Sequence, residues 1–204
     1  MEDGWHRIHS PSPRPGFVLA GVIGLALPFA SCVWLTVAGG LVARVRVGGK
    51  GADASTTNGT VILLLLLIIP LHELLHAIWH PRFGLSPQTV VAIWPTKLRF
   101  GVYYDGCMTR RRWLAMRLAP FILLTLVPVG LLTLFRFVSA LAALDVILEA
   151  LFLVNGIGSG GDVVAAIWVL RQVPAGAQVC FHGGKAYWQA AQAVWSLPNG
   201  APID

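Results

Sequence analysis

The stretch Val61–His80, VILLLLLIIPLHELLHAIWH, decides how the rest of the chain folds. Its apolar run is long enough for a helix that crosses a bilayer, because a span needs about 20 mostly apolar residues. Three ionisable side chains, His72, Glu73 and His76, lie inside this run. Ionisable groups inside a membrane span are costly, so they indicate a functional site.

The spacing of these three residues indicates a metal site. On an α-helix, positions i and i+4 share one face, so His72 and His76 can offer two imidazoles to one metal ion. Glu73 lies beside the pair, where a carboxylate can act as general base toward a zinc-bound water. The alternative is a histidine pair that only hydrogen-bonds to neighbouring helices. The cost of burying such groups in a span disfavours it.

The composition is that of a membrane protein. The 204 residues are 56% hydrophobic and 12% charged, with a mean hydropathy of +0.71. The formal charge of +6 does not indicate nucleic acid, because the basic residues lie in short clusters at the ends of apolar runs. The lipid bilayer is therefore the expected partner. The cysteines, Cys32, Cys107 and Cys180, share no close spacing, so we expect neither a disulfide framework nor a thiolate zinc site.

The hydropathy pattern predicts an all-α membrane protein, a four-helix transmembrane bundle. β-branched and aromatic runs on either side of Pro95-Thr96-Lys97 predict a small membrane-associated β-hairpin at 88–104, between the second and third spans. The predicted spans lie at about 17–42, 61–80, 113–137 and 146–170.

The membrane domain is predicted to cover 17–171, with polar segments on either side. Residues 1–16 are short and rich in proline, which predicts a flexible tail. In the second tail, 172–204, the segment after Cys180 is compatible with a hairpin turn or with a short interfacial helix.

The arginines that precede the third span are expected to mark its membrane boundary. Thr109 is expected to cap this span, and Arg110–Arg112 to contact lipid headgroups. Arg117 is expected to extend toward the near membrane surface.

The distribution of basic residues predicts the orientation. With both termini in the cytoplasm, eleven of the 15 Lys and Arg residues lie inside, and four lie outside. The four are Arg44, Arg46, Lys50 and Arg136. We therefore expect an integral protein of a bacterial cytoplasmic membrane, with N- and C-termini cytoplasmic.

A catalytic zinc ion usually has three protein ligands, and Asp162 is the candidate third one. Asp162 follows the glycine-rich interruption Asn155–Gly161 in the fourth span. Spans two and four run in the same direction, and at about 1.5 Å per residue their site residues lie at matching depths. The glycines would let span four approach span two or unwind locally. The alternative for Asp162 is a buried acid that pairs with an arginine or caps the helix.

His80 continues the stripe of His72 and His76 but is a poor ligand for the same ion. Eight residues raise it about 12 Å above His72 along a straight helix, which is too far for one zinc ion. An interfacial or supporting role is expected.

The quoted motifs resemble those of a bacterial family of zincin-type peptidases with unassigned function, which in turn are similar to site-2 proteases. The resemblance rests on His72–His76, on Asn155–Asp162 and on the Arg-Trp-Leu-Ala-Met-Arg-Leu-Ala-Pro segment 112–120. It implies His72, His76 and Asp162 as zinc ligands, Glu73 as base, and Asn155 as a polar helper near the substrate or the oxyanion. The chain departs from site-2 proteases in having Gly156 after the asparagine, and Gly-Asp-Val in place of Leu-Asp-Gly.

These observations predict an integral membrane zinc metallopeptidase that acts on membrane-associated or membrane-embedded peptide substrates. In this hypothesis Zn²⁺ activates water, Glu73 takes its proton, and Asn155 donates a hydrogen bond to the oxyanion. One alternative is a membrane protein that binds or passes a metal ion without hydrolysis. Another is an inactive scaffold that binds partner helices through its glycine face.

Overall fold

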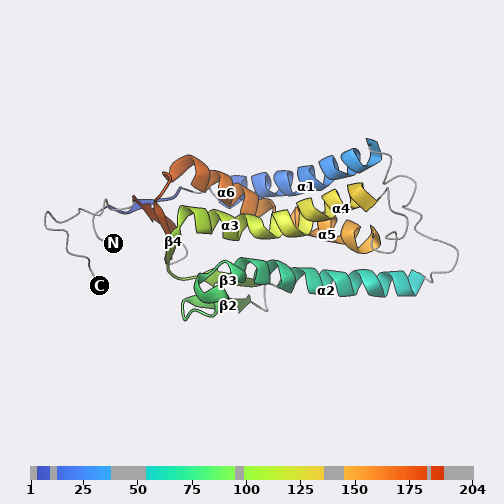
Figure 1. Cartoon of the computed structure of the whole chain (residues 1–204), viewed down its shortest axis with the longest axis horizontal. Helices are drawn as coiled ribbons and strands as arrows, with labels where there is room; N and C mark the ends of the chain where they lie inside the picture. Colours follow the sequence, from blue (N-terminus) through green and yellow to red (C-terminus); the bar gives the residue numbers. More distant parts are fainter. Residues whose placement is uncertain are drawn as a thin grey trace.

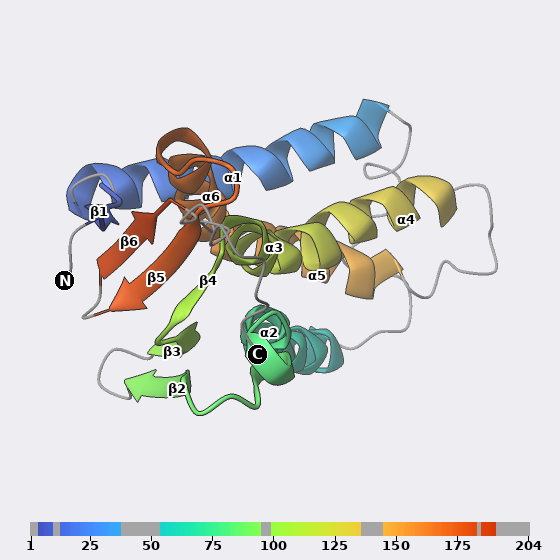
Figure 2. The same ribbon diagram turned by 60° about the vertical axis from the view of Figure 1, so that its left-hand side comes forward.

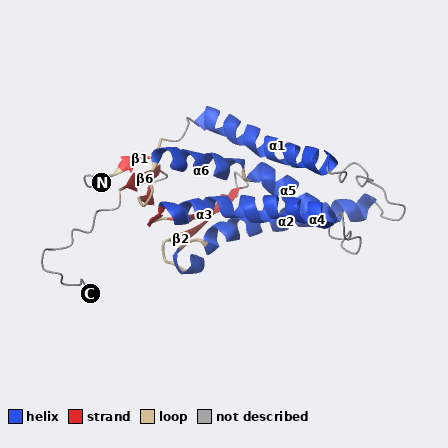
Figure 3. Cartoon of the chain, turned by 45° about the horizontal axis from the view of Figure 1, so that its top comes forward, coloured by secondary structure: helices blue, strands red, loops and turns tan. Residues whose placement is uncertain are grey.

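The computed structural model describes residues 4–9, 13–37, 54–94, 99–135, 145–182 and 185–190. Its helices run along the longest axis, and its strands gather at one end of them (Figures 1 and 3). The long segment that begins at Arg110 contains a π-helical turn in its middle. The helices are α1 (Pro13–Val37), α2 (Ala54–Ile78), α3 (Arg110–Phe121), the π-helical turn Ile122–Leu126, α4 (Val127–Phe135), α5 (Asp145–Gly158) and α6 (Gly160–Gln172).

Within the described ranges, two helices are long and apolar enough to cross a membrane: Pro15–Trp34 and Arg110–Leu134. The pair α5 and α6 passes the same test together but is bent by 53°, so it adds a third span if it is counted as one. The described apolar part of α2, Leu66–Ile78, is shorter. The helical part of the predicted fold is thus found, while a bundle of four spans stays a prediction.

The outer surfaces of these helices are apolar. On α1, Phe17 is 80% exposed and Phe29 is 72% exposed, and on α2 Leu66 is 64% exposed. Large apolar side chains in such a dense array are unfavourable in water, whereas hydrocarbon accommodates them. A membrane environment explains this surface.

The predicted hairpin is confirmed. It consists of β2 (Thr89–Trp94) and β3 (Arg99–Tyr104), which pair antiparallel with Val91 opposite Val102. It lies beside α2 (Figure 2).

The all-α expectation needs correction, because a second sheet is present. It has four strands in the order β1-β6-β5-β4 (Figure 2). The sheet thus pairs the first strand and the last two strands of the chain with β4, which directly precedes α3. The tail at 1–16, which was expected to be flexible, therefore contains a strand. In the second tail, the segment after Cys180 belongs to a hairpin and not to a short interfacial helix. The strands are β1 (His6–Arg7), β4 (Cys107–Thr109), β5 (Gln178–His182) and β6 (Lys185–Gln189).

This sheet is held by an apolar core that it shares with α3 and α6. Ile8 beside β1, Met108 on β4 and Val179 on β5 pack with Trp113 of α3 and Val169 of α6. Each buried side chain of this size contributes about 1.5–3 kcal/mol. The shared core explains why the short terminal strands are ordered.

Cys107 and Cys180 form a disulfide, which corrects the expectation that the cysteines form no disulfide framework. They lie directly opposite each other in the β4–β5 pair and are 73 residues apart in sequence. Spacing along the chain does not reveal strand register, so the pairing was not visible in the sequence.

The start of α3 is capped as expected, and the Arg112 side chain connects it to the end of α2. The Thr109 hydroxyl accepts the Arg112 N–H at 3.3 Å, which confirms the cap. The Arg112 side chain has partners within the protein: its Nε donates to the Trp79 carbonyl at 2.6 Å and its Nη2 to the His80 carbonyl at 2.8 Å. It thereby satisfies carbonyls just beyond the end of α2, where a cation is favoured.

Two glycines, Gly156 on α5 and Gly160 on α6, pack against α1, and the helix bends by 53° between α5 and α6, as the expectation of local unwinding allows. A Cβ on Gly160 would overlap the Ala20 carbonyl oxygen, and one on Gly156 would lie 2.8 Å from Pro28 Cγ. Only a residue without a side chain fits this close approach. The bend at Ser159 lies between these two glycines. Asp162 follows it, on the first turn of α6.

Candidate metal centre

The two histidines of α2 lie on one face of the helix, as their spacing predicts. Their Nε2 atoms are 3.1 Å apart and their ring planes are nearly perpendicular. His76 is buried and His72 is half-buried. Both rings therefore present a nitrogen to the same point in space.

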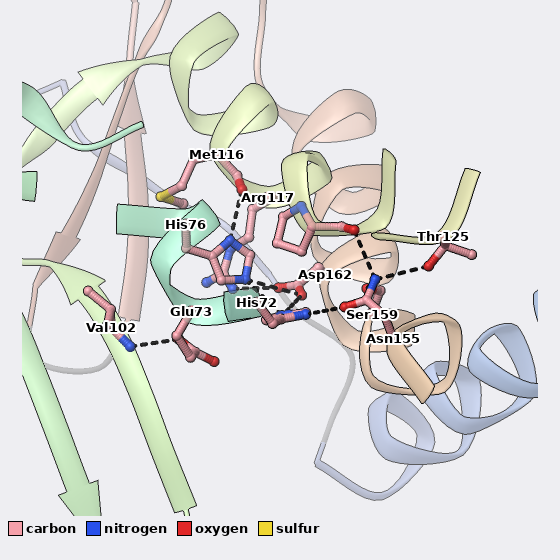
Figure 4. A network of polar contacts seen from close by, with 11 residues as sticks. His72, Glu73, His76, Val102, Met116, Arg117, Thr125, Asn155, Ser159 and Asp162 are labelled. Atoms are coloured by element: carbon pink, nitrogen blue, oxygen red, sulfur yellow. Dashed lines mark hydrogen bonds and ion pairs between the residues drawn. The ribbon is translucent and has the colours of Figure 1, made fainter. Parts of the chain in front are cut away.

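Asp162 reaches this point from α6. Its Oδ2 lies 3.2 Å from His72 Nε2 and 3.3 Å from His76 Nε2 (Figure 4). The three residues are the group of potential ligands found among the described residues. The structure thus brings together the three side chains that were expected to hold a metal ion.

The protonation of the histidines can be inferred from their second ring nitrogens. His72 Nδ1–H donates to Asn155 Oδ1 at 2.7 Å, and His76 Nδ1–H donates to the Met116 carbonyl at 2.8 Å. Because both partners are acceptors, each neutral ring carries its hydrogen on Nδ1 and a lone pair on Nε2. Two nitrogen lone pairs and a carboxylate oxygen then converge with no hydrogen between them.

This donor set fits zinc. Ligands about 2.0–2.1 Å from a tetrahedral zinc ion are about 3.3 Å from one another. The three distances between His72 Nε2, His76 Nε2 and Asp162 Oδ2 are 3.1, 3.2 and 3.3 Å. Three protein ligands would leave one coordination position open, which is typical of a catalytic rather than a structural site.

Asn155 lies behind His72, on the side away from Asp162. Its Nδ2 is within 2.8–3.0 Å of three acceptors: the Pro120 carbonyl, Thr125 Oγ1 and Ser159 Oγ. The side chain is buried, with a residue exposure of 1%. An amide nitrogen has only two hydrogens, and these acceptors engage both. In this geometry Asn155 orients His72 and has no donor left for an oxyanion, which differs from the expected role.

Glu73 lies beside the metal centre without belonging to it. Its Oε2 accepts the backbone N–H of Val102 in β3 at 2.7 Å (Figure 4). Val102 therefore directs its N–H away from β2 and toward α2. The hairpin holds the carboxylate next to the histidines, in a place suited to a proton acceptor.

Arg117 is the site residue that the sequence interpretation missed. Its Nη1 donates to Asp162 Oδ1 at 2.9 Å, and its guanidinium lies 5.3 Å from the centre of the Trp113 ring. The expectation that it extends to the membrane surface is therefore wrong: a carboxylate at the same depth is a stronger partner than distant headgroups. The available signal in the sequence was the i, i+4 spacing of Trp113 and Arg117, which places the indole ring and the guanidinium on one face of the helix.

His80 lies outside the metal centre, as expected. It is fully buried, and its Nδ1 is 3.3 Å from Thr89 Oγ1. Its ring also packs against Tyr104 of β3. His80 therefore connects the end of α2 to both strands of the hairpin that carries Val102.

The three ligands and Glu73 open onto a cleft of about 960 Å³. Residues 100–103 of β3 form one wall, and Arg117 and Phe181 also line it. An open cleft next to the predicted base favours a catalytic site over a closed structural one.

A His-Glu-x-x-His helix joined by a carboxylate from a second helix defines a zincin-type metal site, here on apolar helices. Residues 65–178, more than half of the chain, match the family described as "Putative zincin peptidase". The chain belongs to this family of metallopeptidases. No curated protein and no solved structure matches the chain.

Proposed function

We propose that the protein is an integral membrane zinc metallopeptidase that hydrolyses peptide bonds of membrane-associated or membrane-embedded substrates. The single observation that carries this proposal is the convergence of three potential ligand atoms, from His72, His76 and Asp162, beside a glutamate in an open cleft. Membership of the zincin family supports the same class of reaction.

His72, His76 and Asp162 would hold the zinc ion. When bound, zinc would supply a Lewis acid that acidifies water and polarises a carbonyl. Glu73 would accept the proton of the attacking water at a carboxylate oxygen and return it to the departing amide nitrogen. Asn155 keeps the His72 ring oriented during this chemistry. Arg117 holds the other oxygen of Asp162 and keeps that carboxylate ionised.

The β-hairpin would hold the substrate by edge addition. One edge of β3 pairs with β2, while the Val102 N–H on its other edge meets Glu73. An extended peptide could pair with this second edge, because residues 100–103 line the cleft. A substrate strand that took the Val102 N–H would release Glu73 at the moment when a base is needed.

The proposed setting is a bacterial cytoplasmic membrane, with four spans and both termini in the cytoplasm. The excess of basic residues at the end where the strands gather supports this orientation. The expected partners are the bilayer and a peptide or membrane-protein substrate, and not nucleic acid.

The alternative function is a membrane metal-binding or ion-handling protein without hydrolysis. The bend between α5 and α6 favours it, because broken helices with an acid at the break also occur in ion-transport sites. Glu73 separates the two functions: it is not a ligand, so a carrier should not depend on it.

The decisive experiment measures zinc content and peptide cleavage of the protein purified in mild detergent. The wild type should hold about one zinc ion and Asp162→Ala close to none. Glu73→Gln should keep the zinc and lose cleavage, and Glu149→Gln is the control, because Glu149 is an acid on a different helix, α5. Wild-type protein without zinc would refute the metal site, while zinc binding without Glu73-dependent cleavage would favour the ion-handling alternative.

A further inference from the structure

A second cavity lies next to the metal centre. It has a volume of about 210 Å³, well above the roughly 10–15 Å³ that one water molecule requires. It lies between α3, α6 and the four-stranded sheet, and it shares Arg117, Ala165 and Phe181 with the cleft of the metal centre. Arg117 therefore contacts both spaces.

The polar side chains that line this second cavity are all donors. They are Arg7, Arg117 and Lys185, together with Trp113 and Trp168. Arginine, lysine and tryptophan side chains have hydrogen-bond donors and no acceptor. No acidic, amide or hydroxyl side chain is among the lining residues that the structure describes. Arg117 is paired with Asp162, so Arg7 and Lys185 supply the positive charge that no lining carboxylate balances.

Two of these donors are buried and have no acceptor among the described residues. They are Nε of Arg117 and Nε1 of Trp168. Buried donors in folded proteins almost always have a partner, so these two donors favour a ligand that supplies acceptor atoms. Both belong to side chains that line the same cavity. The chemistry that completes this cavity is an anion with several acceptor atoms.

We propose that this cavity binds a phosphate group, from the headgroup of an anionic phospholipid or from free phosphate. A phosphate has more acceptor oxygens than a carboxylate, so it can accept from donors on α3, α6, β1 and β6 together. The proposal goes beyond the proposed peptidase function and does not depend on it.

The position of the cavity favours the lipid source. Trp168 lies one turn before the end of α6, and the Arg171 guanidinium is 5.7 Å from its ring centre. Tryptophan and arginine at the end of an apolar helix are typical of the headgroup level of a membrane. Basic cavities between membrane helices at this level bind anionic headgroups. Arg7 and Lys185 are exposed, which leaves a path for a headgroup from the membrane surface.

The test titrates the full-length protein in non-ionic detergent and measures its thermal unfolding temperature. The probes are short-chain phosphatidylglycerol, short-chain phosphatidylcholine, inorganic phosphate and an acidic peptide. Phosphatidylglycerol should raise the unfolding temperature in a saturable manner at low salt, and less at high salt. Phosphatidylcholine should have no such effect, because the positive charge of its choline group is repelled by Arg7 and Lys185. A similar rise with inorganic phosphate would assign free phosphate as a second source.

The variants connect the effect to the cavity. The pair Arg7→Gln and Lys185→Gln should weaken the apparent affinity for phosphatidylglycerol about tenfold or more, because charged hydrogen bonds are lost. Trp168→Phe keeps the ring, removes the buried donor and should weaken binding several-fold. The matched control is the pair Arg82→Gln and Arg111→Gln, which makes the same change in charge on exposed arginines outside the cavity.

Three outcomes would overturn the proposal. The first is no stabilisation of the wild type by either phosphate probe. The second is an equal loss in the control pair, which would show general attraction to the basic surface. The third is stabilisation by the acidic peptide alone, which would assign the cavity to a carboxylate. Trp168→Phe keeps the net charge, so its result separates the cavity from the overall charge even if the double variant fails to fold.

Discussion

Arg117 Nη1 lies 2.9 Å from Asp162 Oδ1, while the other oxygen of the same carboxylate faces the two histidines. The arginine and the imidazoles thus use opposite oxygens of one side chain. This arrangement orients the Asp162 carboxylate, so that Oδ2 alone is available to bind a metal ion. The carboxylate can therefore be buried at membrane depth without losing its charge.

Removal of the arginine should weaken metal binding. Arg117→Met is expected to lower zinc affinity about 10- to 100-fold, which is the usual effect of losing a group that orients a ligand. Zinc affinity can be measured by competition with a chromophoric chelator. Arg111→Met is the control, because Arg111 is exposed and lies outside the cleft. Unchanged affinity in Arg117→Met would show that Asp162 is oriented without it.

Asn155→Ala tests whether this residue orients His72 or contacts the oxyanion. We expect a zinc affinity lowered about 10- to 100-fold. The free energy of unfolding should also fall by about 1–3 kcal/mol, because Thr125 and Ser159 lose a buried partner. An oxyanion donor would behave differently, since its loss lowers kcat and leaves zinc affinity intact. Chelator competition together with steady-state kinetics distinguishes the two roles.

Val102→Pro tests the proposed substrate edge. Proline removes the N–H that faces Glu73 and preserves the hydrogen bonds to β2, which come from the neighbouring residues of the strand. We expect a higher KM for peptide with unchanged zinc content. Val91→Pro is the matched control, because Val91 lies opposite Val102 and its N–H points to the far edge of β2. Equal effects of both substitutions would indicate damage to the hairpin and not loss of a substrate contact.

The disulfide should stabilise the four-stranded sheet. Cys107→Ser, or reduction with dithiothreitol, is expected to lower stability by about 2–4 kcal/mol, because the bond closes a long loop. Thermal unfolding with and without reductant measures this effect. Cys32→Ser is the control, since Cys32 is a free cysteine on α1. A wild type that is insensitive to reductant would mean that the bond does not form in the purified protein.

The orientation in the membrane can be decided with fusions to the C-terminus. The basic residues predict a cytoplasmic C-terminus. A fluorescent reporter fused to it, which folds in the cytoplasm, should therefore be active, and alkaline phosphatase fused to it should be inactive. The disulfide points the opposite way, because such bonds persist mainly in oxidising compartments. We expect the charge rule to hold and Cys107 and Cys180 to be reduced in growing cells. Active alkaline phosphatase would show that the C-terminus lies outside the cytoplasm, contrary to the charge rule. The disulfide would then lie in an oxidising compartment, where it persists.

The sequence by itself determined the features that depend on local periodicity and hydropathy. The i, i+4 spacing placed His72 and His76 on one helix face, and the depth count put Asp162 at their level. The β-branched and aromatic runs on either side of a turn-forming break predicted the β2–β3 hairpin. These inferences succeeded because helix rise and side-chain direction are fixed by the backbone.

Only the tertiary structure decided which distant groups meet. Arg117 and Asp162 are 45 residues apart, and Cys107 and Cys180 are 73 apart. The partners of Asn155 are set by a π-helical turn and by the bend at Ser159, neither of which has a simple sequence signal. Contacts of this kind depend on how helices and strands pack against one another, and residue spacing along the chain carries no information about that packing.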